Sequence, residues 1–260
     1  MKILFIGDIF GKPGRVSVAR WVPVLKEEFE IDVVIANAEN AAGGLGATPE
    51  LLEELRNESV QAFTFGNHTW RKKSMVKAID KMTDVVRPAN YPEQAPGVGS
   101  LVLSLADGRK LGLINLIGRV YMEPFDCPFA TVDTELSMVS KETNTILVDM
   151  HGEATAEKVA MGWHLDGRCS AVVGTHTHIQ TADERVLPGG TGYITDVGMT
   201  GPQDSVIGVK KELIVQKFIS GMPTQFEVAQ DRPGIRAVVI DIDDTKGTTT
   251  KITRISRDDE

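Results

Sequence analysis

The chain has 260 residues, of which 42% are hydrophobic and 25% are charged, an ordinary composition for a soluble globular protein. A core of this size needs no disulfides, and the two cysteines, Cys127 and Cys169, are typical of a reducing, cytoplasmic compartment. The net charge of -8 disfavours general nucleic-acid binding, because phosphate backbones are bound by lysine and arginine. No run approaches the about 18 apolar residues of a membrane helix, and the first run is too short for a signal peptide.

The first third of the chain alternates short apolar runs with segments of helical periodicity. The expected strands are residues 2–7, 32–37 and 62–65, and the expected helices are residues 14–30, a segment that Thr48 and Pro49 open, and residues 71–81. Thr48 suits a helix N-cap, and Pro49 suits the first helical position. This βαβαβ order predicts parallel strands with both faces buried.

The rest of the chain adds antiparallel strands. Asp107-Gly108 and Gly189-Gly190 each lie between apolar runs and indicate hairpins. The expected strands are residues 100–105, 110–117, 145–149, 171–174, 184–187, 192–196, 224–230, 235–243 and 249–255, and the expected helices are residues 155–164 and 210–218. Because no repeat or linker interrupts this order, we predict one α/β domain over residues 1–260, with two mixed sheets packed together and helices outside.

Residues of metal-ligand type follow five of the expected strands. The segments are Gly7-Asp8, Asn37-Ala38-Glu39-Asn40, Gly66-Asn67-His68, Met150-His151-Gly152 and Gly174-Thr175-His176-Thr177-His178. Each segment by itself more often has a structural role than a metal-binding one, since Gly-Asp turns and single histidines are common. The occurrence of all five in one chain is hard to explain by chance. His176 and His178 would point to the same side if they continued a strand. Strand ends in such sheets meet at one edge, so we predict a metal centre there.

In this order the five segments resemble the calcineurin-like metallophosphoesterase superfamily. Two departures stand out, because Phe10 lies where that superfamily usually has a histidine, and residues 37–40 replace its usual Gly-Asp-x-x-Asp. Both departures are similar to one bacterial branch, the YmdB-like phosphodiesterases, as are residues 7–15, 87–92 and 195–199. The resemblance implies a four-layer β-sandwich of two mixed sheets flanked by helices, with a dinuclear metal site at the strand ends.

A dinuclear centre with ions about 3.5–4 Å apart needs a bridging carboxylate, for which the longer side chain of Glu39 is suited. We expect one ion on Asp8, Asn40 and His178, and the other on Asn67, His151 and His176. Such a shell of oxygen and nitrogen suits iron, manganese or zinc. The resemblance favours iron, with manganese as the alternative, for the two ions of each subunit.

His68 follows an expected ligand and needs a role of its own. In the family pattern, a metal-bridging hydroxide attacks phosphorus and the matching histidine protonates the leaving oxygen, a role that suits a histidine pKa. The alternative is that His68 orients Asp8 or the substrate. The resemblance implies a phosphodiesterase acting on 2',3'-cyclic nucleotides. The other hypothesis is a metal-dependent, nucleotide- or RNA-associated regulatory module with little turnover.

Substrate contacts follow less directly from the residues. Lys12 and Arg15 open an expected helix whose N-terminus could meet a phosphate, although a plain surface helix start explains them equally well. Asn90, Gly198 and Met199 could line the pocket or simply form turns. The expected partner is a small phosphodiester, with no membrane, and the resemblance implies a homo-oligomer.

Overall fold

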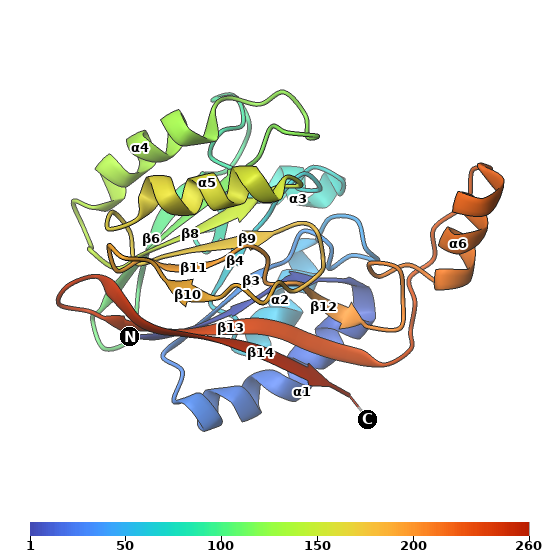
Figure 1. The fold of residues 1–260 in the computed structure, drawn as a ribbon, viewed down its shortest axis with the longest axis horizontal. Coiled ribbons are helices and arrows are strands. Elements are labelled where there is room, and N and C mark those ends of the chain that lie inside the picture. Colours follow the sequence, from blue (N-terminus) through green and yellow to red (C-terminus); the bar gives the residue numbers. More distant parts are fainter. Residues whose placement is uncertain (260) are drawn as a thin grey trace.

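Two β-sheets lie face to face at the centre of the computed structural model, which describes residues 1–259 (Figure 1). The strands are β1 (Lys2–Ile6), β2 (Asp8–Ile9), β3 (Val33–Asn37), β4 (Ala62–Thr64), β5 (Val85–Val86), β6 (Ser100–Ser104), β7 (Lys110–Ile117), β8 (Ile146–His151), β9 (Ala171–Thr175), β10 (Arg185–Val186), β11 (Gly192–Ile194), β12 (Met199–Pro202), β13 (Pro233–Asp243) and β14 (Thr248–Asp258). The helices are α1 (Gly11–Phe29), α2 (Pro49–Asn57), α3 (Lys73–Ala78), η1 (Ile79–Lys81), α4 (Pro128–Val139), α5 (Thr155–Leu165) and α6 (Lys211–Ser220). Within residues 1–259, none of these helices combines the length and the apolar character that crossing a bilayer requires.

Both sheets are mixed, as the sequence predicts. The first has strand order β2-β12-β13-β1-β3-β4-β5, with β14 paired to β13, and the second has order β10-β11-β9-β8-β7-β6. Strands β1, β3, β4 and β5 run parallel, as do β7, β8, β9 and β11. Hydrogen bonds from Asn37 and Thr64 to the Asp149 carboxylate join the ends of β3 and β4 to β8 in the other sheet. The strand ends of the two sheets therefore meet in one place.

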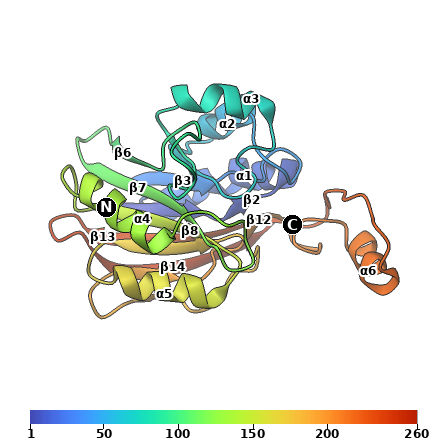
Figure 2. The ribbon, with the colours of Figure 1, turned by 90° about the horizontal axis from the view of Figure 1, so that it is seen from above.

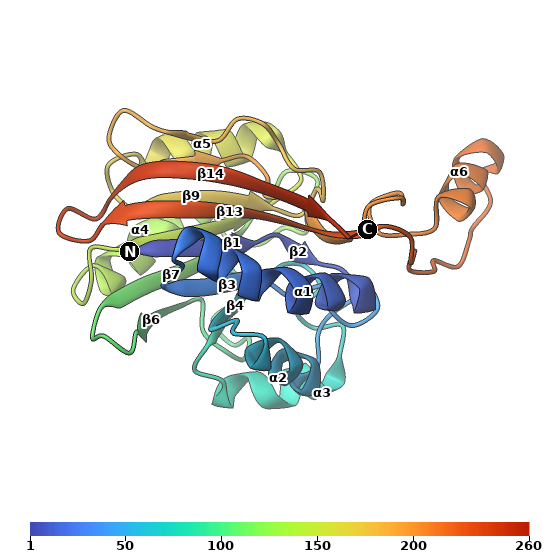
Figure 3. The same ribbon diagram turned by 90° about the horizontal axis from the view of Figure 1, so that it is seen from below.

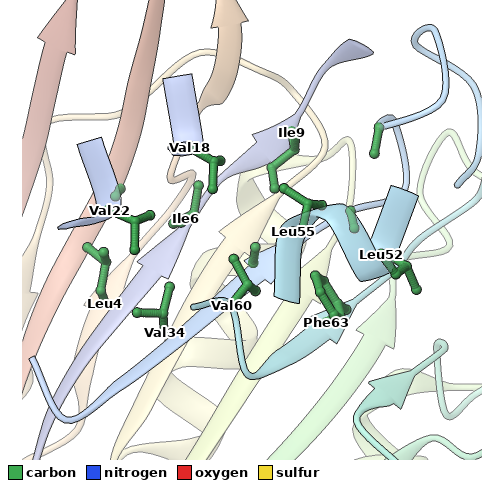
Figure 4. Close-up of a cluster of buried hydrophobic side chains, with 14 of the residues drawn as sticks. Leu4, Ile6, Ile9, Val18, Val22, Val34, Leu52, Leu55, Val60 and Phe63 are labelled. Carbon is green, nitrogen blue, oxygen red and sulfur yellow. The ribbon is translucent and has the colours of Figure 1, made fainter. Parts of the chain in front are cut away.

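The layers follow from the alternation of side chains along buried strands. In β1, Ile3 and Phe5 pack in the core between the sheets, whereas Leu4 and Ile6 pack against α1. Figure 4 shows Leu4 and Ile6 beneath Val18 and Val22 of that helix. Figures 2 and 3 show α1, α2 and α3 on one outer face and α4 and α5 on the other. The four-layer arrangement expected from the resemblance is confirmed.

Most expected elements lie where the sequence places them, and the differences have local causes. Helix α1 begins at Gly11, three residues before the expected start at residue 14, because Gly11 adopts a φ of 60° and turns the chain directly into the helix. Helix α4 is not among the expected elements, although Pro128 at its first turn is a helix-start signal. Residues 224–230 do not form the expected strand, and only Val228 pairs there, in a single bridge to Val209.

One element leaves the body of the molecule. In Figures 1, 2 and 3, α6 projects away from the two sheets on extended connections. Val215, Phe218 and Ile219 of this helix, and Met222 just after it, are between 51% and 81% exposed. These positions follow the i, i+3, i+4, i+7 spacing of one helix face. An apolar stripe therefore lies uncovered by the described part of this chain, residues 1–259.

Candidate metal centre

All seven expected ligands converge at the meeting edge of the sheets. Asp8 opens β2, and Glu39 and Asn40 follow β3 directly. The remaining ligands are Asn67 after β4, His151 at the end of β8, and His176 and His178 just after β9. Asp8, Glu39, Asn40 and His151 are at most 1% exposed. Buried strand ends therefore hold these side chains in a fixed place.

Four ligand atoms surround one point. The Nε2 atom of His151 lies 3.2 Å from Glu39 Oε1, 3.0 Å from Asn67 Oδ1 and 3.1 Å from His176 Nδ1. The ligand atoms of Glu39, His151 and His176 all lie within 4.8 Å of one another. Two oxygens and two imidazole nitrogens thus face the same small space.

A hydrogen bond on the far side of His151 decides which of its nitrogens can bind metal. Thr175 Oγ1 donates to the Asp149 carboxylate at 2.7 Å and therefore accepts from His151 Nδ1 at 2.9 Å, so in the neutral form of His151 the lone pair is on Nε2. On His176, Nε2 lies 3.2 Å from Glu153 Oε2, whereas Nδ1 faces His151 Nε2 at 3.1 Å. His151 Nε2 and His176 Nδ1 therefore point at the shared space, as a metal ion requires.

The pKa values of the side chains around this space are those expected of a cation-binding site. Burial tends to raise the pKa of Glu39, but the neighbouring His151 and His68 lower it to about 2, so Glu39 is ionised. Burial, with His151 nearby, lowers the pKa of His176 to about 3, so this imidazole is neutral. Burial likewise tends to lower the pKa of His151, but Glu39 and Asp8 raise it to about 9. A positive charge is therefore stabilised at this position.

A second set of ligand atoms lies beside the first. Asp8 is fully buried, and its Oδ1 atom has no hydrogen-bond partner within residues 1–259. That oxygen lies 3.8 Å from His178 Nε2, and His178 donates its Nδ1 proton to the Ile207 carbonyl at 3.0 Å. The Asn40 amide nitrogen donates to the same His178 Nε2 at 3.2 Å. An unpartnered buried carboxylate oxygen such as that of Asp8 is costly unless a cation lies beside it.

The donor set fits a metal ion. Carboxylate oxygens, amide groups and imidazole nitrogens, with no thiolate, suit hard or borderline divalent metals. Desolvation by burial also raises the pKa of Asp8, although the neighbouring His178 and His151 act in the opposite direction. The chain therefore provides a binding cluster for divalent metal at this edge.

The loop that carries His176 and His178 corrects one expectation. Strand β9 ends at Thr175, and His176 and His178 have φ angles of 102° and 66°, so neither continues the strand. The expectation that both imidazoles point to the same side as strand residues is wrong. They instead point to different neighbours, His176 to His151 and His178 to Asp8. The left-handed backbone divides the two histidines between the two ligand sets.

Two buried charges missed by sequence reasoning hold this loop. Asp196 accepts hydrogen bonds from the Thr177 amide at 3.0 Å and from Thr177 Oγ1 at 2.6 Å. Lys158 donates to Asp196 at 2.8 Å and to the Thr175 carbonyl at 3.3 Å. Lys158 is 1% exposed and Asp196 is fully buried. A lysine within the apolar periodicity of α5 is the signal in the sequence that could have indicated this pair.

His68 lies at the edge of both ligand sets. Its Nδ1 atom is 2.6 Å from Asn40 Oδ1 and 3.3 Å from Glu39 Oε1, and its backbone amide donates to Glu39 Oε2 at 2.8 Å. Burial lowers the pKa of His68, although Glu39 acts in the opposite direction. The side chain is 20% exposed and lines a cavity next to the ligands. His68 thus connects the ligand cluster with space that a substrate can enter.

That cavity measures about 390 Å³, within the range of small-molecule sites. Part of its lining is the ligand cluster, and the rest is largely apolar. At the end next to the ligand cluster, the lining residues are Glu39, Asn40, His176 and His178, with His68 beside them.

The five expected substrate contacts lie elsewhere among the described residues. Lys12 and Arg15 line a neighbouring hollow, and Arg15 donates to Glu54 at 3.0 Å and to the Ala41 carbonyl at 2.7 Å. Asn90 is 1% exposed and bonds the backbone of Ile117 and Asp126.

Gly198 and Met199 also have structural surroundings. A Cβ atom at Gly198 would lie 2.8 Å from Gln180, and Met199 packs in a small apolar cluster with Phe10. The hollow of Lys12 and Arg15 shares Gly43 and Val228 with the cavity. Substrate contact by any of the five stays a prediction.

Comparison with known proteins agrees with this geometry. A family model described as YmdB-like protein matches residues 4–255. A 2',3'-cyclic-nucleotide 2'-phosphodiesterase of Bacillus subtilis (strain 168) is 48% identical over 260 residues, which cover 100% of this chain and 98% of that one. A crystal structure of a hypothetical protein from Thermus thermophilus has a TM-score of 0.93 at 38% identity, covering 100% of both chains. The structure of a phosphatase from Mycoplasma pneumoniae has a TM-score of 0.93 at 33% identity, covering 99% of this chain and 93% of that one. The chain belongs to the YmdB-like family.

Proposed function

We propose that residues 1–260 form one catalytic domain, a dinuclear-metal phosphodiesterase that hydrolyses 2',3'-cyclic nucleotides. The observation that carries the proposal is the convergence of seven ligand residues, four of them almost completely buried, beside His68 and next to a cavity. The substrate class comes from the name of the Bacillus subtilis relative. The chemistry is hydrolysis of a phosphodiester bond in a small ligand.

Each ligand set suits one ion. Asp8, Asn40 and His178 would hold the first, and Asn67, His151 and His176 the second. Glu39 would bridge them, because its Oε1 atom lies 3.4 Å from the Asn40 amide and 3.2 Å from His151 Nε2. Iron is our first choice for both ions and manganese the alternative. When bound, the ions would lower the pKa of water and neutralise charge on the phosphoryl oxygens.

Asn40 links the first ion to His68. As placed, Asn40 Oδ1 lies 2.6 Å from His68 Nδ1 and accepts its proton. That oxygen has a second lone pair, with which it could also bind metal. A protonated His68 would carry its other proton on Nε2, and by giving that proton to the leaving oxygen it would return to the neutral imidazole.

The test is hydrolysis by metal-loaded protein. We expect turnover of 2',3'-cyclic AMP and of bis(p-nitrophenyl) phosphate, and none by Asp8→Ala. If neither substrate is hydrolysed and Asp8→Ala behaves as wild type, the protein is a nucleotide- or RNA-associated regulatory module instead.

We further propose that the protein is cytoplasmic and self-associates. The uncovered apolar stripe of α6, formed by Val215, Phe218, Ile219 and Met222, supports self-association, because isolated stripes of this kind are stabilised by burial. A mass measurement in solution tests it.

A further inference from the structure

The part of the cavity beyond the ligand cluster is apolar. Its wall comprises Phe10, Leu45, Ile207, Val209, Phe226 and Val228, and this set is called the apolar wall below. The wall begins directly at the ligands, because the rings of Phe10 and His178 are in edge contact with centroids 5.6 Å apart. If the phosphate of a substrate lies at the ligands, the group attached to that phosphate therefore lies against the apolar wall.

The inner part of the wall is held rigidly. The Phe10 ring lies between Gly44 and Gly208, and a Cβ atom at either glycine would come within 2.5 Å of that ring. Both glycines have positive φ angles, 85° and 101°, which favour glycine in any case. Phe10 therefore stays in place at the position between the ligands and the outer wall.

The outer part of the wall presents an aromatic ring. Phe226 is 53% exposed and lines the cavity, and the Lys217 ammonium lies over its ring at 4.8 Å from the centroid. A cation–π contact of this kind helps to fix the ring orientation. A flat group that enters the cavity can stack on this ring and shield it from water.

The charges around the cavity indicate which kind of chemical group the apolar wall can bind. Within residues 1–259, no lysine or arginine lines it, whereas Glu153 and Glu227 both do. Lys210 and Lys217 lie beside the wall, but the first is ion-paired with Glu227 and the second lies over the Phe226 ring, so neither offers a free cation inside the cavity to a second phosphate. The group that occupies the wall is therefore uncharged, flat and apolar on its faces, which describes a nucleobase.

We propose that the apolar wall is a nucleobase subsite in which Phe226 stacks on the base of the substrate. The proposal rests on the proposed function, since a phosphodiester at the ligands is what places a base at the wall. Every base has a π-face, so the stack would bind bases with little discrimination among them.

The experiment compares two cyclic phosphodiesters. The first is 2',3'-cyclic AMP, and the second is glycerol 1,2-cyclic phosphate, which keeps the five-membered cyclic phosphate but has no base. For Phe226→Ala we expect kcat/KM to fall about 5- to 150-fold on the nucleotide, the range measured for loss of one stacked base. On the glycerol compound, kcat/KM should stay within about twofold of wild type.

Two variants serve as controls. Phe226→Trp should restore the nucleotide rate, because it keeps a ring for stacking. Phe218→Ala removes an exposed phenylalanine of α6 that does not line the cavity, and it should leave both kcat/KM values unchanged. A 5'-phosphate added to 2',3'-cyclic AMP should lower kcat/KM, since it brings a charge toward the wall.

The outcomes separate the two proposals. An equal fall on both substrates for Phe226→Ala, or no fall on either, would overturn the subsite and leave the phosphodiesterase intact. Wild-type turnover of the glycerol compound without turnover of the nucleotide would overturn both the subsite and the cyclic-nucleotide substrate, and only phosphodiesterase activity in general would remain. If wild type hydrolyses neither, the proposed function fails, and the subsite fails with it.

Discussion

The cavity has two parts that are built in opposite ways. One is the ligand end, where Glu39, Asn40, His68, His176 and His178 line it, and the other is the apolar wall. At the ligand end, side chains leave buried strand ends, and the atoms not used as ligands are fixed by further hydrogen bonds, as Thr175 and Asp149 fix His151. The outer wall comes from residues 205–230, which include the projecting α6, and its Phe226 is half-exposed. The difference teaches that chemistry is fixed by the two-sheet core, whereas the segment facing solvent is free to set specificity.

The largest expected effect tests the ligand end. Glu39→Ala removes the oxygen that faces both ligand sets, so we expect loss of both ions and a fall in kcat of more than about 10³-fold, since each ion stabilises the transition state by several kcal/mol. Elemental analysis of metal content and phosphodiester turnover measure this. Glu142→Ala, which removes an exposed carboxylate bonded to Lys110, is the matched control. Retention of two ions by Glu39→Ala would exclude a bridging role.

His68→Ala separates chemistry from binding within the ligand end. Because His68 contacts the ligands Asn40 and Glu39 but belongs to neither ligand set, both ions should remain bound. We expect kcat to fall about 10²- to 10⁴-fold, the usual contribution of a general acid. The measurement pairs kcat with metal content. Loss of metal would assign His68 to coordination and not to proton transfer.

A smaller effect is expected from the pair that braces the histidine loop. Lys158→Met leaves the fully buried Asp196 without its counter-charge and frees the Thr175 carbonyl, so the loop loses its fixed position. Loss of such support typically weakens metal binding about 10- to 100-fold. Metal titration at a temperature where the variant is fully folded measures the affinity apart from stability. Lys158→Arg retains the charge and should recover part of the lost metal affinity. Equal metal affinity in wild type and Lys158→Met would show that the pair has only a structural role.

The ligand end is also the part of the site that the sequence predicts best. Short apolar runs that end in Asp, Glu, Asn or His determine both a buried parallel strand and a polar group at its end, so Asp8, Glu39 and His151 are recognisable from the order of residues alone. The tautomer of His151 is not, because it depends on Thr175 as a hydrogen-bond partner in space.

Almost nothing in the sequence predicts the apolar wall. Phe10, Leu45 and Phe226 come from three separate loops or loop ends, and no periodicity connects them. The expected strand at residues 224–230 shows the same difficulty, since three consecutive residues there, Phe226, Glu227 and Val228, line the cavity and only Val228 forms a bridge. The buried pair of Lys158 and Asp196 is 38 residues apart in the chain, which local patterns do not reach.

The smallest expected effect on catalysis concerns α6. Phe218 is 81% exposed at the centre of the apolar stripe, and Phe218→Glu places a charge where self-association would bury a ring. We expect a multimer of the wild type to dissociate toward monomer in light scattering, with kcat on glycerol 1,2-cyclic phosphate within about twofold of wild type, because Phe218 does not line the cavity. Ser220→Glu, which adds the same charge on the exposed opposite side of the same helix, is the control. An unchanged mass for Phe218→Glu would show that the stripe is not the contact between copies. A large fall in kcat would show that residues 205–230 influence the ligand end and not specificity alone.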